Sequence, residues 1–224
     1  MSVREAALVK DPLRRLVAHD LRGTMPASPE GVVLVLHGGG EKGFGPMPWW
    51  EGPVLRMWPF AKAIERRAGD RLAVVRLKNR YFGWNGPEQT PLTDARWALD
   101  RVRERYACLP VALVGHSMGG RVVTHLADEP DVTTVVALAP WVEEGDPRPG
   151  RPGLRVLLMH GVDDTTTDPR RTERLGEQLS AKGADVTWRP VEDEGHSMLR
   201  HAPTWHREVA EFVTASMLSG PPRR

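Results

Sequence analysis

Cysteine is almost absent from this chain of 224 residues, which contains only Cys108. A single thiol excludes a disulfide within the chain and a zinc site built on several cysteines. The histidines show no His-x-x-x-His spacing either, so the sequence predicts no metal and no other cofactor. Scarcity of cysteine is typical of proteins in a reducing compartment, and we expect a cytoplasmic location.

Long hydrophobic runs are also missing. The aliphatic run from Val32 to Leu36 is among the longest, whereas a membrane-spanning helix requires about 20 apolar residues. Residues 1–5, Met-Ser-Val-Arg-Glu, lack the apolar stretch of a secretion signal. The sequence therefore predicts neither a membrane span nor export.

A strong excess of one charge is missing as well, because 31 lysines and arginines face 29 aspartates and glutamates. A protein that binds nucleic acid needs a basic face to neutralise phosphates. Basic pairs such as Arg66 and Arg67 instead follow acidic residues such as Glu65, a pattern typical of solvated helix surfaces. We expect no nucleic-acid partner, and the oligomeric state stays open.

The composition, with 40% hydrophobic and 27% charged residues, is that of an ordinary globular protein. The length predicts one domain over residues 1–224, with loose ends at residues 1–11 and 219–224. Apolar runs rich in β-branched residues recur along the chain and predict strands that are covered on both faces. These runs are Val32–Leu36, Leu72–Leu77, Val111–Val114, Val132–Leu138, Leu154–Met159 and Val186–Trp188.

Segments with helical periodicity separate these runs. In the clearest, Pro91–Tyr106, apolar side chains repeat at intervals of three and four residues, and Thr90 is the predicted N-terminal cap. Strands that alternate with helices predict an α/β fold, with a mostly parallel, twisted sheet and helices on both faces. Residues 12–21 are predicted as an antiparallel edge strand. The other predicted helices are Phe60–Ala68, Met118–Ala127, Pro169–Lys182 and Thr204–Met217.

The strongest chemical signal is Gly115-His116-Ser117-Met118-Gly119, which follows a predicted strand and precedes a predicted helix. A serine hydroxyl is a weak nucleophile that needs an exposed position, a nearby base and donors for the oxyanion that forms. A tight turn between strand and helix projects Ser117 above the sheet, and the residues two positions away have to be small. Gly115 and Gly119 meet that requirement, so the motif predicts a nucleophilic serine.

Two more motifs follow predicted strands and supply further catalytic functions. The glycines of His37-Gly38-Gly39-Gly40 let the main chain approach a substrate closely and direct an N–H group towards it. His196 follows the last predicted strand, and histidine is the side chain best suited to act as a general base near neutral pH.

Two adjacent carboxylates, Asp163 and Asp164, follow the strand that ends at Met159. A carboxylate in this position can orient an imidazole and stabilise its charged form. Helix capping is the other common role, but Asp168 lies directly before Pro169 and is better placed for it. The residues alone leave both Asp163 and Asp164 open as the acid.

The glycine motif, Ser117, an aspartate and His196 each follow a strand, and ligands of open α/β sheets bind at that edge. From residue 31 to residue 217 this arrangement resembles the α/β-hydrolase superfamily, whose triad runs serine, acid, histidine in chain order. The resemblance implies that Ser117 is the nucleophile and His196 the base. It implies Asp164 as the acid, three positions after Gly161, with Asp163 as the alternative.

The resemblance also implies that the backbone N–H groups of Met118 and Gly39 bind the oxyanion, with Gly40 as a second choice. Many members insert a helical cap after the strand that ends here at Leu138, whereas residues 140–153 form a short connection rich in proline and glycine. The chain thus resembles a small, cap-free esterase or lipase. Neighbours of the motifs and aromatic residues of the long loops are the candidate pocket residues: Gly40, Trp49, Trp50, Tyr81, Trp84, Trp141 and Met198.

The predicted reaction is hydrolysis of a small or short-acyl carboxylic ester through an acyl-enzyme on Ser117, with thioesters or lactones as related substrates. The same triad could instead serve acyl transfer, perhydrolysis or lyase chemistry, because one fold hosts many reactions. A ligand-binding protein that keeps the fold without catalysis is the remaining alternative.

Overall fold

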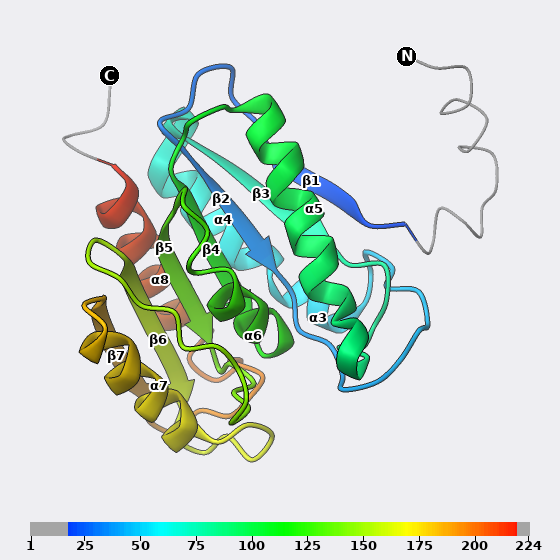
Figure 1. The fold of residues 1–224 in the computed structure, drawn as a ribbon, viewed down its shortest axis with the longest axis vertical. Coiled ribbons are helices and arrows are strands. Elements are labelled where there is room, and N and C mark those ends of the chain that lie inside the picture. The colour runs from blue at the N-terminus through cyan, green and yellow to red at the C-terminus, as the bar shows by residue number, and fades with distance from the viewer. Residues whose placement is uncertain (1–17, 219–224) are drawn as a thin grey trace.

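The computed structural model describes residues 18–218. Seven strands form one sheet in the order β1-β3-β2-β4-β5-β6-β7 (Figure 1). β1 pairs with β3 in antiparallel orientation, and all other neighbouring strands are parallel. The strands are β1 (Asp20–Thr24), β2 (Gly31–Leu36), β3 (Leu72–Lys78), β4 (Val111–His116), β5 (Val132–Leu138), β6 (Arg155–Gly161) and β7 (Asp185–Val191).

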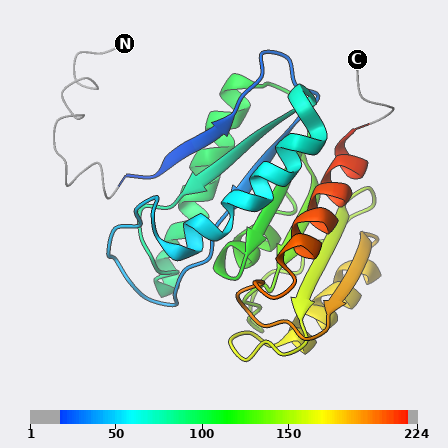
Figure 2. The same cartoon turned by 180° about the vertical axis from the view of Figure 1, so that it is seen from behind.

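Helices cover both faces of this sheet, as Figures 1 and 2 show from opposite sides. One face carries α5 (Thr90–Arg105), α6 (Met118–His125) and α7 (Pro169–Ala181). The other face carries α4 (Trp58–Ala68) and α8 (Ala202–Met217), which pack against each other. The predicted mostly parallel sheet with helices on both faces is confirmed.

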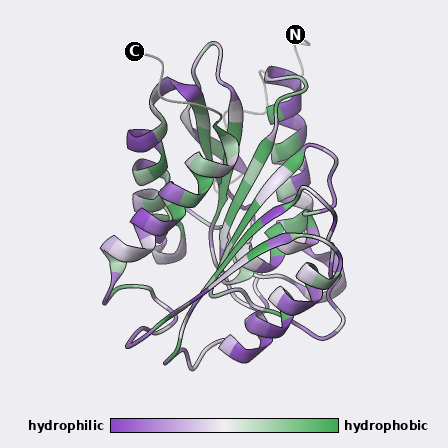
Figure 3. Ribbon diagram, turned by 90° about the vertical axis from the view of Figure 1, so that its left-hand side faces the viewer, coloured by the Kyte–Doolittle hydropathy of each residue, from purple (hydrophilic) through white to green (hydrophobic). Residues whose placement is uncertain are grey.

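The central strand β2 shows how the two cores form. Val32, Leu34 and Leu36 belong to the core under α5, α6 and α7, whereas Val33 and Val35 belong to the core under α4 and α8. The strand is apolar at every position because neither of its faces meets solvent. Figure 3 shows the same distribution, with hydrophobic strands in the centre and hydrophilic residues on the surrounding helices.

Some element boundaries differ from the sequence predictions. The edge strand lies at Asp20–Thr24, where it pairs with β3, whereas residues 12–17 of the predicted strand lie outside the described residues. Thr90 does not cap α5, because it is the first helical residue and its hydroxyl donates to the C=O of Gly83 at 2.9 Å. The short helix α3 (Gly52–Arg56) was not predicted, since five residues are too few to show a period. The predicted loose ends, residues 1–11 and 219–224, also lie outside the described residues.

The connection between β5 and β6 leaves one end of the sheet uncovered by a cap. Residues 139–154 form turns and irregular structure with no helix. The carboxyl ends of β2, β4, β5, β6 and β7 therefore meet at an edge where only loops cover them.

Among the helices that the structure describes, none is both long and apolar enough to cross a membrane.

Candidate active site

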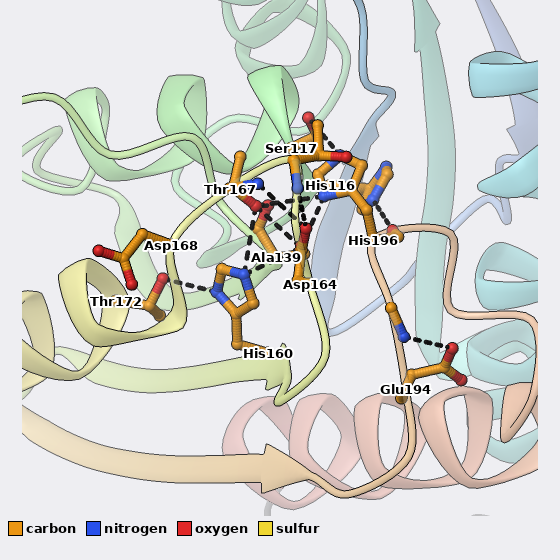
Figure 4. Close-up of polar contacts among 12 residues, drawn as sticks. His116, Ser117, Ala139, His160, Asp164, Thr167, Asp168, Thr172, Glu194 and His196 are labelled. Carbon is orange, nitrogen blue, oxygen red and sulfur yellow. Dashed lines mark hydrogen bonds and ion pairs between the residues drawn. The ribbon is translucent and has the colours of Figure 1, made fainter.

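Ser117 lies in the turn between β4 and α6, at the carboxyl edge of the sheet (Figure 4). Its backbone has φ 54° and ψ −114°, a conformation that residues with a side chain rarely adopt. Its N–H donates to the C=O of Leu138 at 2.9 Å, and its C=O accepts from the N–H groups of Arg121 at 3.0 Å and Trp141 at 3.1 Å. These contacts hold the turn in its strained conformation, in which the hydroxyl of Ser117 belongs neither to β4 nor to α6.

The two glycines that flank Ser117 are required by contact with the neighbouring main chain. A Cβ atom at Gly115 would lie 2.2 Å from the carbonyl oxygen of Gly119. A Cβ atom at Gly119 would lie 2.7 Å from the carbonyl oxygens of both Leu36 and His37. Neither position has room for a larger residue, so the turn depends on both glycines.

A chain of hydrogen bonds joins Ser117, His196 and Asp164. Nε2 of His196 lies 2.9 Å from Oγ of Ser117, and Nδ1 lies 2.7 Å from Oδ2 of Asp164 (Figure 4). The structure therefore brings together three residues that the sequence placed after three different strands. Asp163, the alternative acid, is exposed and lies 3.8 Å from Arg200. The arrangement suits transfer of the serine proton to an imidazole that a carboxylate orients.

Asp164 is buried, yet its carboxylate is well supplied with donors. Oδ1 accepts the N–H groups of Thr166 at 2.7 Å and Thr167 at 3.0 Å. Oδ2 contacts the rings of His160 and His196 and the hydroxyl of Thr167. Burial opposes ionisation, but the hydrogen bonds from His160, His196 and Thr167 outweigh it and hold the pKa of Asp164 well below its ordinary value. The acid is therefore charged at neutral pH and can stabilise an imidazolium.

His37 lies beneath the glycine motif and fixes its main chain. Burial lowers the pKa of His37 to about 4, so the ring is neutral near pH 7. Its Nε2 accepts the N–H of Asn79 at 3.1 Å, which leaves the ring proton on Nδ1. Nδ1 donates that proton to the C=O of Gly38 at 2.6 Å. The histidine thereby orients the peptide unit that joins Gly38 to Gly39.

Two main-chain donors near Ser117 remain open. Within residues 18–218, the N–H groups of Met118 and Gly39 have no hydrogen-bond partner. Met118 is the first residue of α6, and a Cβ atom at Gly39 would lie 2.6 Å from its side chain, so the two lie side by side. Gly40 cannot replace Gly39 as a donor, because its N–H already donates to the C=O of Phe82 at 3.1 Å.

Two buried side chains hold the loop that carries His196. Burial lowers the pKa of His116 to about 3, and the neutral ring donates from Nε2 to the C=O of His196 at 2.9 Å. The carboxylate of Glu194 accepts two backbone N–H groups of the same loop, at 3.0 and 2.8 Å, and the indole N–H of Trp205 at 3.3 Å. These contacts fix the main chain that carries the imidazole of His196.

The sequence analysis did not identify His116, His160, Glu194 or Thr167 as parts of the site. His116 stood inside the serine motif and His160 directly before Gly161, but both lie at the ends of strands, and a strand pattern does not show which buried ring contacts a loop. Glu194 is 2% exposed, and nothing in the sequence shows that this one of the acidic residues is buried among donors.

A cavity of about 820 Å³ adjoins Ser117 and the glycine motif. Of the predicted pocket residues, Gly40, Trp84 and Trp141 line it. Arg121 lines it too, and its guanidinium lies over the rings of Trp84 and Trp141, 4.0 and 4.4 Å from their centroids. An ion pair of 2.7 Å with Asp146 holds the guanidinium in place. The cavity thus has a rigid aromatic wall.

The other four predicted pocket residues do not line this cavity. The indole of Trp49 donates to Asp20 on β1, at 3.0 Å, and the side chain of Trp50 is 70% exposed. Tyr81 packs on the long loop that follows β2, and Met198 is 2% exposed in the core beneath α8. The loop after β2 reaches the edge strand β1, where Trp49 binds Asp20, so Trp49 lies away from the cavity at Ser117. Within residues 18–218, no group of three or more acidic, histidine or cysteine side chains is arranged to hold a metal ion.

The two neutral histidines predict a loss of stability in mild acid. In the unfolded chain a histidine has a pKa near 6.5, whereas burial keeps the pKa of His37 near 4 and that of His116 near 3. Below pH 6.5 the unfolded chain therefore binds protons that the folded chain does not. Between pH 7 and pH 5 the free energy of unfolding should fall by on the order of 2 kcal/mol for each histidine. Urea unfolding followed by tryptophan fluorescence measures this change.

A matched variant separates this effect from other titrations. His116→Gln keeps a side-chain N–H donor for the C=O of His196 but does not titrate, so the fall between pH 7 and pH 5 should shrink by on the order of 2 kcal/mol. Burial also lowers the pKa of His206, which adds to the fall in both proteins. An equal fall in the variant and the wild type would contradict the assignment. Below about pH 4 the depressed pKa values of Asp146 and Asp164 should continue the loss.

Comparisons with known proteins bear on the family and the fold. The model of the Alpha/beta hydrolase family matches residues 32–221, and no curated protein sequence matches the chain. Among solved structures, esterase Est2 from the Planctomycetes species Thermogutta terrifontis has a TM-score of 0.67 at 17% identity, over 92% of this chain and 91% of that chain. Est1E from Butyrivibrio proteoclasticus has a TM-score of 0.62 at 15% identity, over 88% and 94%.

An alpha-beta serine hydrolase homologue from Coxiella burnetii has a TM-score of 0.63 at 14% identity, over 86% of this chain and 90% of that chain. At identities this low, similarity to solved structures shows a shared fold. The family model, in contrast, is matched over most of the chain, from β2 to beyond α8. The chain therefore belongs to the alpha/beta hydrolase family.

Proposed function

We propose that this protein is a serine hydrolase that cleaves a carboxylic ester through an acyl-enzyme on Ser117. The observation that carries the proposal is the hydrogen-bonded chain from Oγ of Ser117 through His196 to the ionised Asp164. It lies beside a cavity and beside two open N–H groups, which are the parts that acyl transfer requires.

The first half of the reaction forms the acyl-enzyme. Oγ of Ser117 attacks the ester carbonyl while Nε2 of His196 takes the hydroxyl proton. The N–H groups of Gly39 and Met118 bind the oxyanion of the tetrahedral intermediate, and Asp164 stabilises the imidazolium. His196 then donates the proton to the leaving alkoxide, and the alcohol departs.

The second half returns the serine. His196 takes a proton from water, the resulting hydroxide attacks the acyl carbon, and the acid leaves as the proton returns to Oγ of Ser117. The proton transfers between Ser117 and His196 use two atoms that lie 2.9 Å apart, and the imidazolium that forms lies 2.7 Å from Asp164. Product analysis with an added alcohol or hydroperoxide distinguishes hydrolysis from acyl transfer or perhydrolysis, because only transfer diverts the acyl group from water.

The open edge of the sheet supports short acyl groups as substrates. No cap extends the cavity, and the indoles of Trp84 and Trp141 limit it on one side. The Thermogutta terrifontis Est2 structures contain propionate and butyrate, which agrees with a short acyl group in a site of this fold. The substrate class proposed here is a small ester with a short acyl chain.

A series of p-nitrophenyl esters tests this preference. We expect acetyl and butyryl esters to have a kcat/KM at least about tenfold above that of the dodecanoyl ester, because no cap covers a long chain where it extends past the wall of Trp84 and Trp141. Trp141→Ala should raise the relative rate for longer chains by opening the wall, whereas Trp50→Ala, outside the cavity, should not. Peak turnover on the dodecanoyl ester would refute the short-acyl preference.

A further inference from the structure

A second histidine contacts the acid of the triad. Nε2 of His160, on β6, lies 3.0 Å from Oδ2 of Asp164, the same oxygen that Nδ1 of His196 contacts at 2.7 Å (Figure 4). The side chains of His160 and Asp164 are both completely buried. The mechanism derived above requires one imidazole on this carboxylate, so the second needs its own explanation.

Asp164 determines which nitrogen of His160 carries the proton, and Thr172 on α7 holds the other nitrogen. A carboxylate only accepts hydrogen bonds, so Nε2 of His160 has to carry the proton that faces Asp164. Nδ1 of a ring with one proton is then an acceptor, and the hydroxyl of Thr172, 2.8 Å away and fully buried, donates to it. The threonine thus holds the ring in the orientation in which it donates to the triad acid.

The surroundings of Asp164 contain few other titratable groups. The groups that face it are His160 on β6 and His196 in the loop after β7, with His116 on β4 one ring further, 4.8 Å from His196 between ring centroids. The one side chain that α7 contributes to this network is the neutral Thr172. The hydroxyl of Thr167 lies between the two rings, 3.2 Å from a nitrogen of each. Oδ2 of the carboxylate is therefore shared between two imidazoles and one hydroxyl.

We infer that His160 is a positioning residue, which holds Asp164 as an ionised acceptor and limits how strongly its carboxylate attracts the proton on His196. A hydrogen bond to a carboxylate stabilises its charge and lowers its affinity for a proton. The donor from His160 also helps to fix the orientation of the carboxylate. It binds Oδ2, while two backbone N–H groups bind Oδ1, so both oxygens are held. The inference rests on the proposed function, because it requires that Ser117, His196 and Asp164 act as a triad.

The test is the rate at which a fluorophosphonate probe labels Ser117, measured across pH in the full-length protein. His160→Leu removes the donor, and we expect the maximal rate to fall by roughly 10- to 100-fold. The acid limb of the profile should also move up by about 0.5–1 pH unit, because Asp164 with one donor fewer attracts the proton on His196 more strongly. His160→Gln keeps an N–H near the position of Nε2 and should retain the rate within about threefold, with its acid limb unmoved.

A second pair of variants tests the inference even if the His160→Leu variant does not fold. Thr172→Val removes the hydroxyl that holds the ring of His160 against Asp164, so it should lower the labelling rate and move the acid limb in the same direction by a smaller amount. The matched control is Thr134→Val, because Thr134 on β5 is also fully buried and its hydroxyl has no partner among the described residues. The control should label at the wild-type rate with an unchanged profile.

Each result decides between positioning and packing. Lower rates with an unmoved acid limb, or a glutamine variant as slow as the leucine variant, would show that His160 only fills space. If the leucine variant does not fold, an unchanged profile in Thr172→Val overturns the inference and a shifted one supports it. A wild-type protein whose Ser117 is never labelled would contradict the proposed function itself, which is a different outcome from labelling that His160 does not influence.

Discussion

Replacing Ser117 with alanine should lower kcat/KM for p-nitrophenyl butyrate by at least about 10⁴-fold. The alanine side chain cannot form the acyl-enzyme, and His196 loses the hydroxyl that lies 2.9 Å from its Nε2. The protein should fold normally, because the three hydrogen bonds that hold the turn at residue 117 all involve its main chain. Thermal unfolding of both proteins checks this, and the fluorophosphonate probe should label only the wild type.

Ser180→Ala is the matched control, since Ser180 is an exposed serine on α7. It should keep full activity and full labelling. Hydrolysis by Ser117→Ala at a tenth of the wild-type rate or more would contradict the assignment of the nucleophile. A folded wild type that neither hydrolyses esters nor reacts with the probe would favour a ligand-binding protein that keeps the fold without catalysis.

The central strands could be predicted because burial on both faces makes their residues apolar one after another. Val32–Leu36 is buried on both faces, so all its residues are apolar, and its shortness and β-branched residues favour a strand over a helix. The turn at Ser117 was similarly visible, because Gly115 is required by contact with Gly119 four residues away and the serine, with the two glycines around it, forms a short continuous motif. Local constraints of this kind leave a local pattern in the sequence.

The residues around the triad could not be predicted, because their roles depend on contacts between distant segments. His116 contacts a carbonyl 80 positions away, and Glu194 binds donors from its own loop and from α8. Trp49 and Trp84 both stand in long loops, yet one packs on β1 and the other lines the cavity. The composition of a loop does not determine its path, so the sequence could not separate these two tryptophans.

The choice between the two adjacent aspartates can be tested with a matched pair of variants. Asp164→Asn should lower kcat/KM by on the order of 10⁴-fold, whereas Asp163→Asn should stay within about threefold of the wild type. Asp163 is exposed and its carboxylate lies 3.8 Å from Arg200, so removing its charge affects only a weak surface pair. Steady-state kinetics on p-nitrophenyl butyrate, with thermal unfolding as the folding control, measures both effects.

The expected loss at Asp164 follows from the donors around it. Two backbone N–H groups point at Oδ1, so the amide oxygen of an asparagine would face them and its NH2 group would take the place of Oδ2. That NH2 group would then meet the ring nitrogens of His160 and His196, which both donate to the carboxylate in the wild type. His196 could satisfy this contact only by moving its proton to Nε2, and in that tautomer it cannot accept the proton of Ser117. If Asp163→Asn lost more activity than Asp164→Asn, the result would show that Asp163 is the acid.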